Sequence, residues 1–69
     1  MMQNEAKKLG VNLKRIRTKK GISQGKIARM LKIDKGFISN IENGKTNPTL
    51  ATIAKLAKVV GVPLKDLLS

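Results

Sequence analysis

Several residue types that build catalytic and metal sites are absent from this 69-residue chain. It contains no cysteine and no histidine, and only 4 acidic residues. The lack of cysteine excludes a disulfide, and the lack of both thiol and imidazole ligands excludes a zinc site in practice. No glycine-rich phosphate loop of the required spacing is present either. We therefore expect no catalytic residue, no metal and no cofactor.

Aromatic residues and long apolar runs are also scarce. Phe37 is the only aromatic residue, which is too few for the stacking platforms that bind single-stranded RNA or DNA. No apolar run approaches the roughly 18 residues of a membrane-spanning helix, and no signal peptide is visible. These absences predict a soluble, cytoplasmic protein.

The shortage of acids leaves the chain strongly basic. The 15 Lys and Arg residues give a formal net charge of +11, and eleven of them lie between Lys7 and Lys35. Such an excess indicates a nucleic-acid partner. A solvated surface kept soluble by its charge and a basic membrane binder are the alternatives. Several short helices with good turn signals favour a packed globule over the membrane binder.

Apolar periodicity and turn residues predict an all-α fold of five helices, with no strand. In the first helix Ala6, Leu9, Leu13 and Ile16 share one face. The predicted helices cover residues 5–19, 24–31, 35–43, 50–60 and 63–68. Residues 1–4 are expected to be disordered, and residues 5–69 to form a single compact domain.

Short polar residues and proline mark where these helices begin. Ser23, Asp34 and Thr49 each precede a helix and can cap it. Pro63 suits the first position of the last helix. Gly21 fits the left-handed position that follows the end of the first helix.

Residues 23–45 are the most informative segment. They predict two short amphipathic helices joined by a tight turn at Lys32-Ile33. Such a pair can present its second helix away from the body of the protein. In a basic protein this is the geometry of a helix-turn-helix that places one helix in the DNA major groove.

The outward face of the second of these helices carries side chains suited to base edges. Lys35 can donate to guanine O6 and N7, Asn40 can pair with adenine N6 and N7, and Ser39 can serve either base. Gly36 would let the backbone approach a phosphate or base edge closely. The alternative is an exposed face that is simply solvated. Phe37 can touch a thymine methyl group or a sugar-phosphate stretch, or it can pack at the rim of the core.

In its motifs the chain resembles the lambda Cro/C1-like repressor family, also called the XRE family. The resemblance covers about residues 9–68 and rests on the order and spacing of short motifs. They are Leu13-Lys14-Arg15-Ile16-Arg17, Lys20-Gly21, Ser23-Gln24, Ala28, Ile33, Ile38-Ser39, Ile41-Glu42-Asn43-Gly44-Lys45 and Asn47-Pro48-Thr49-Leu50. Two departures stand out: Lys32 stands where the family usually has glycine, and Gly25-Lys26 replaces a commonly acidic pair.

The resemblance implies further roles for individual residues. It places base contacts at the positions named above and a left-handed turn residue at Lys32. It also implies a bridge between Arg17 and Glu42 that holds the guanidinium near a phosphate, where the alternative is a weak exposed ion pair. The DNA phosphate contacts that we predict are Arg17, Gln24, Lys26, Phe37, Asn43, Lys45, Thr46 and Asn47.

We therefore expect a lambda-repressor-like regulator that binds double-stranded DNA. It would act as a homodimer on a palindromic operator and repress by occluding a promoter. Val62, Pro63 and Leu64 are the predicted dimer interface, unless they only close the monomer core. An antitoxin, a restriction-modification controller protein and a non-specific nucleic-acid binder are the alternative functions.

Overall fold

A computed structural model describes the backbone of residues 2–69, and its side chains from Glu5 onward. Over this range the chain is helical without any strand, which confirms the predicted all-α, five-helix class. The helices are α1 (Met2–Lys19), α2 (Gln24–Leu31), α3 (Lys35–Glu42), α4 (Leu50–Val60) and α5 (Leu64–Leu68). None of these helices combines the length and the apolar character needed to cross a membrane.

Two predicted helix starts differ from the structure. Helix α1 begins at Met2, three residues before the predicted Glu5, so residues 2–4 are helical where the sequence predicted disorder; Met1 lies outside the described residues. Pro63 has an extended backbone (φ −63°, ψ 150°) and stands before α5 rather than at its first position. The proline ring fixes φ but leaves ψ free, so the ring suits the residue that precedes a helix as well as the first helical residue.

Two of the three predicted caps form. The Ser23 hydroxyl accepts a hydrogen bond from the Lys26 amide at 3.0 Å, and Thr49 accepts one from Thr52 at 3.2 Å. Asp34 occupies the position before α3, but its side chain makes no capping hydrogen bond. Its carboxylate instead lies beside Gly36, where an added β-carbon would be 2.9 Å from Asp34 Oδ2. The predicted cap at Asp34 is therefore wrong in this structure.

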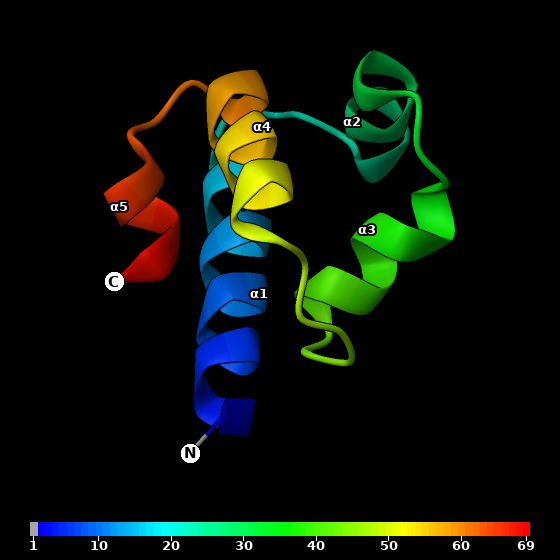
Figure 1. Ribbon diagram of the computed structural model, residues 1–69. Helices are drawn as coiled ribbons and strands as arrows, with labels where there is room; N and C mark the ends of the chain where they lie inside the picture. Colours follow the sequence, from blue (N-terminus) through cyan, green and yellow to red (C-terminus); the bar gives the residue numbers. More distant parts are fainter. Residues whose placement is uncertain (1) are drawn as a thin grey trace.

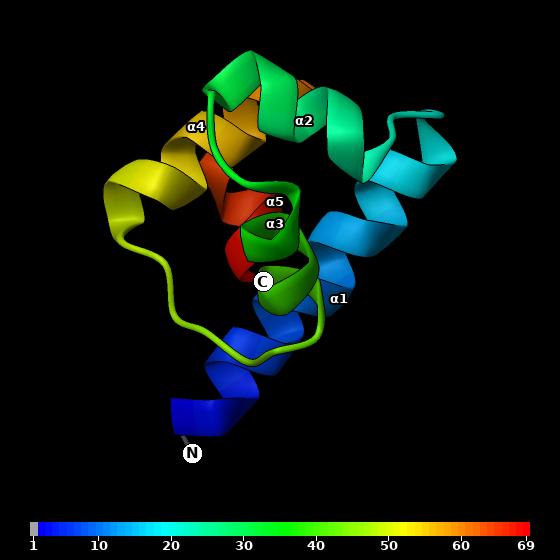
Figure 2. The same cartoon turned by 90° about the vertical axis from the view of Figure 1, so that its right-hand side faces the viewer.

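The long helix α1 is the axis of the domain. Helices α2 and α3 lie on one side of it and α5 on the other, and α4 packs against α2 and α5 (Figure 1). Helix α1 packs against both α3 and α5, and α2 packs against α3 and α4. Viewed from the side of α2 and α3, α3 stands foremost (Figure 2). The fully buried core side chains come from all five helices: Leu13, Ile27, Ile38, Ile41, Leu56, Val60 and Leu67.

Gly10 allows α1 and α3 to approach closely. A β-carbon at this position would lie 2.3 Å from the Ile41 carbonyl oxygen and 2.5 Å from that of Glu42. Both distances are far inside van der Waals contact, so the C-terminal end of α3 lies directly on the backbone of α1. Glycine inside a helix costs up to about 1 kcal/mol relative to alanine. Here that cost is offset by the packing of α3.

Asn12 connects α1 to α5 from inside the protein. Its side chain is buried, and Nδ2 donates hydrogen bonds to the carbonyl oxygens of Leu67 at 2.9 Å and Ser69 at 3.1 Å. Leu67 lies in α5 and Ser69 directly follows it, so both carbonyls stand at the C-terminal end of this helix, where carbonyl oxygens lack intrahelical partners. Asn12 therefore fixes the C-terminal end of this short helix.

Candidate nucleic-acid interface

The turn between α2 and α3 sets the direction in which α3 leaves the domain. Lys32 has φ 57° and ψ 44°, the left-handed conformation that the family resemblance implies. The amide of Ile33 then donates to the Ala28 carbonyl oxygen at 3.0 Å and closes the end of α2. Because Ile27 of α2 and Ile38 of α3 are both fully buried, the two helices share one core.

Helix α3 has one buried and one accessible face. Lys35, Gly36 and Asn40 are exposed, and Ser39 is half-buried. The structure therefore brings the four predicted base-contacting residues together on one accessible surface. Phe37 is half-buried and packs against the core. Its placement favours packing at the rim of the core over a role in DNA contact for most of the ring, and the rest of the ring lies at the surface.

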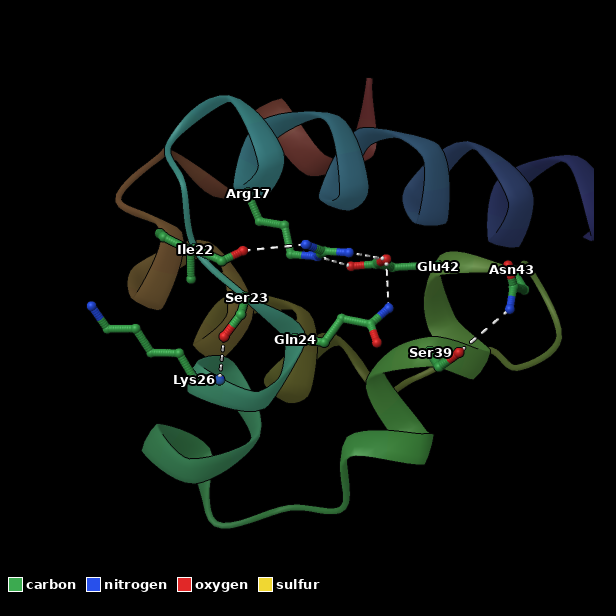
Figure 3. A network of polar contacts seen from close by, with 8 residues as sticks. All are labelled: Arg17, Ile22, Ser23, Gln24, Lys26, Ser39, Glu42 and Asn43. Carbon is green, nitrogen blue, oxygen red and sulfur yellow. Dashed lines mark hydrogen bonds and ion pairs between the residues drawn. The ribbon is translucent and has the colours of Figure 1, made fainter.

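An ion pair fixes the C-terminal end of α3 to α1. Arg17 Nε lies 2.5 Å from Glu42 Oε2, and Arg17 Nη2 lies 2.9 Å from Glu42 Oε1. The two side chains are 14% and 3% exposed, so the pair is largely buried rather than a solvated surface pair. Arg17 Nη1 also donates to the Ile22 carbonyl oxygen at 3.2 Å (Figure 3). The bidentate geometry holds the angle between the two helices.

The hydrogen bond to Glu42 raises the pKa of the Arg17 guanidinium above its ordinary value. Burial acts in the opposite direction, and the charge of Glu42 adds to the rise. A raised pKa keeps a basic group protonated, and the stability that it contributes is present at every pH below the pKa of the unfolded state. The raised pKa therefore favours the protonated guanidinium beside Glu42.

Gln24 completes this polar network from α2. Its Nε2 donates to Glu42 Oε1 at 2.9 Å, so three helices meet at one carboxylate (Figure 3). The sequence indicated Gln24 only as a phosphate ligand and did not reveal this contact. Its partner, Glu42, lies 18 residues away, and no short-range pattern predicts such a contact. A glutamine amide has two N–H groups. One of them therefore remains for another acceptor.

The other predicted phosphate ligands flank α3 at the surface. Lys26 is exposed near the start of α2, and Asn43, Lys45 and Asn47 are exposed after α3, with Thr46 half-buried. Asn43 Nδ2 lies 3.5 Å from Ser39 Oγ and can donate to it (Figure 3). The accessible surface thus runs from the start of α2 across α3 to the loop 43–49. We call it the reading surface.

The reading surface is rich in hydrogen-bond donors and nearly free of acids. Glu42 is occupied by Arg17 and Gln24, which leaves Asp34 as the exposed carboxylate beside the exposed face of α3. Ammonium, amide and hydroxyl groups suit phosphate oxygens and base edges. Among the described residues no group of three or more acids, histidines or cysteines could hold a metal ion.

Comparisons with known proteins agree with this geometry. The helix-turn-helix family model matches residues 13–67. The HTH-type transcriptional regulator SutR of Escherichia coli is 32% identical over 68 residues, which are 99% of this chain but only 38% of SutR. The chain thus spans less than half of that relative.

Two solved structures superpose over nearly the whole chain. The restriction-modification controller protein C.AhdI from Aeromonas hydrophila has a TM-score of 0.86 and 31% identity, covering 93% of this chain and 97% of that one. The DNA-binding domain of BldD has the same TM-score and identity, with both chains fully covered. With the family match over most of its length, the chain belongs to the helix-turn-helix family of lambda Cro/C1-like, or XRE, type.

Proposed function

We propose that this protein is a transcriptional regulator that binds double-stranded DNA in a sequence-specific manner. The observation that carries the proposal is α3, whose polar face is exposed while a buried ion pair holds its angle. A recognition helix must present side chains to base edges at a fixed angle, and a bidentate, largely buried pair provides that rigidity. Similarity to proteins named as transcriptional regulators supports this function.

Base readout is assigned to the exposed face of α3. Lys35 and Asn40 supply the readable donors, while Ser39 contributes a hydroxyl and Gly36 allows close approach of the backbone. The phosphate ligands are Arg17, Gln24, Lys26, Phe37, Asn43, Lys45, Thr46 and Asn47. If each protomer neutralises about four phosphates, a bound dimer should give a slope of log K against log salt near about −7.

The test compares base-reading and phosphate-binding variants on a site selected from random DNA. Lys35→Ala and Asn40→Ala should each cost roughly 1–3 kcal/mol on that site and relax the preference at one base position. Lys45→Ala should instead weaken binding to all sequences alike. If the α3 variants leave the sequence preference intact, the recognition assignment is wrong.

The proposed regulator acts as a homodimer on a palindromic operator, with one α3 for each half-site about 34 Å apart. Val62 and Leu64 are half-buried against the core, and Pro63 is exposed. Leu68 lies one turn after Leu64 and is 47% exposed, which extends the apolar surface along α5. Two α5 surfaces related by a two-fold axis would be self-complementary.

The exposed leucine offers the cleaner test of this interface. Leu68→Glu should make the protein monomeric in sedimentation and remove cooperative binding to two half-sites, because it puts a charge in the contact. Leu50→Glu is the matched control, since Leu50 is 62% exposed on α4. A dimer that survives Leu68→Glu would place the interface elsewhere. Leu64→Glu is less informative, because Leu64 also packs against the core.

Repression by promoter occlusion is the mechanism that we assign first. A controller protein of a restriction-modification system is the second candidate, favoured by the near-complete overlap with C.AhdI. Reporter transcription from a promoter that overlaps the selected site separates the two candidates. Repression at every protein concentration supports the first, whereas activation over part of the range supports the controller.

A further inference from the structure

The helix-turn-helix leaves a basic side of α1 without a role. Five exposed cations lie on the outward side of this helix: Lys7, Lys8, Lys14, Arg15 and Lys19. Lys7 and Lys14 are seven residues apart, which is about two helical turns, so they lie on the same side of α1. Thr18 follows one turn after Lys14 and is also exposed. We call Lys7, Lys14 and Thr18 the α1 edge.

The α1 edge is continuous with the reading surface. A β-carbon at Gly44 would lie 3.1 Å from Lys7 Cα, so the loop that follows α3 rests on the backbone of α1 at this point. Further along α1, Lys14 and Thr18 line a surface groove together with Asn43. The close approach at Gly10 brings the two helices together between these points. Thus Lys7 and Lys14 flank the predicted phosphate ligands at the end of α3.

Among the side chains that the structure describes, no carboxylate pairs with this edge. Glu42 lines the same groove, but its oxygens accept hydrogen bonds from Arg17 and Gln24. Glu5 precedes Lys7 by two residues, which turns the two side chains about 160° apart around the helix. Within residues 5–69 no ion pair involves Lys7 or Lys14. Their charges are therefore free to act on an external anion.

We infer that the α1 edge binds DNA phosphates next to those held by the loop 43–47, extending each protomer's contact beyond the helix-turn-helix. The inference rests on the proposed function, because it takes duplex DNA as the partner of the reading surface. Lysine ammonium groups act as point charges, and a threonine hydroxyl can donate to a phosphate oxygen. Such contacts add affinity and salt dependence but carry no base preference.

The experiment measures how salt weakens DNA binding in charge-matched variants. Lys7→Gln/Lys14→Gln removes the edge, and Lys8→Gln/Lys55→Gln removes the same charge from exposed positions outside the edge, one on α1 and one on α4. Each lost phosphate contact makes the slope of log K against log salt shallower by about 0.9, so the edge variant should lose about 1.8 per bound protomer. The control should keep nearly the wild-type slope. Lys7→Arg/Lys14→Arg should also keep it, because arginine retains both charges. Circular dichroism checks that every variant is folded.

Two DNA probes keep this inference separate from the proposed function. On a selected operator the edge variant should lose affinity while keeping the wild-type base preference. On a mixed-sequence duplex it should show the same change of slope. Equal slopes for the edge and control variants overturn the inference. A wild-type protein that binds operator and mixed duplex equally refutes sequence-specific regulation, while the slope comparison on the mixed duplex still decides whether the edge binds phosphate.

Discussion

Replacing Arg17 by methionine should strand the Glu42 carboxylate inside the protein. The Glu42 side chain is 3% exposed and accepts hydrogen bonds from Arg17 Nε, Arg17 Nη2 and Gln24 Nε2. Removing one partner of a buried ion pair costs about 3–5 kcal/mol. Gln24 would still donate one bond, and the 14% exposure of Arg17 admits some water. We therefore expect a loss of about 3 kcal/mol, at the low end of that range.

A loss of this size is large for so small a chain. At about 0.05–0.15 kcal/mol per residue, its total stability is roughly 3–10 kcal/mol. The melting temperature should fall by about 12–24 °C, since 1 kcal/mol shifts it by about 4–8 °C in domains of this size. Glu42→Leu should cost less, because the freed Arg17 guanidinium keeps its bond to the Ile22 carbonyl oxygen and can turn toward solvent.

The double variant Arg17→Met/Glu42→Leu separates the pair from its surroundings. It removes both charges and fills their space with apolar atoms, which is often nearly neutral for a buried pair. Its loss should therefore be smaller than the sum of the single losses, with a coupling energy of at least about 2 kcal/mol. Urea denaturation of the four proteins, followed by circular dichroism, measures this energy. Additive losses within about 0.5 kcal/mol would show that the network does not hold α3.

Four further substitutions test other parts of the fold and site. Gly10→Ala should destabilise the protein by about 1–3 kcal/mol, because the new β-carbon overlaps carbonyl oxygens of α3. Gly25→Ala is the control: its β-carbon meets only ordinary contacts, so it should stabilise the protein by up to about 1 kcal/mol. Similar shifts of the melting temperature for both variants would refute the close approach of α1 and α3. Lys32→Gly should stabilise by up to about 1 kcal/mol in urea denaturation, since the residue is left-handed, and a clear loss would reveal an unrecognised contact of the lysine. Asp34→Asn should raise affinity for mixed-sequence duplex by removing an exposed carboxylate beside Gly36, and lower affinity would instead show that this carboxylate helps to hold α3.

The helices of this chain, their ends and its DNA-binding class can be predicted from the sequence. Apolar spacing places five helices because a helix must bury one stripe, as Leu13 and Leu56 do at zero exposure. Ser23 and Thr49 begin helices because their hydroxyls satisfy amides within the next three residues. The glycines at 21, 44 and 61 have positive φ after helices, where only a residue without a β-carbon is unstrained. The charge of +11 and the motif order indicate a DNA-binding helix-turn-helix without any tertiary information.

Contacts between distant residues needed the folded structure. From sequence alone, Gly10 is only an unfavourable residue inside a helix. The structure shows that it makes room for the carbonyl oxygens at the end of α3. Asn12 and Gln24 are ordinary surface residue types, and only folding brings them to Ser69 and Glu42, 57 and 18 residues away. Asp34 matches a capping pattern, yet its carboxylate makes no capping bond. Sequence alone determines what short-range periodicity and local hydrogen bonds decide. The angle of α3 depends instead on long-range packing and on the buried Glu42 carboxylate, whose bridge to Arg17 only the family resemblance implied and whose bond to Gln24 only the fold revealed.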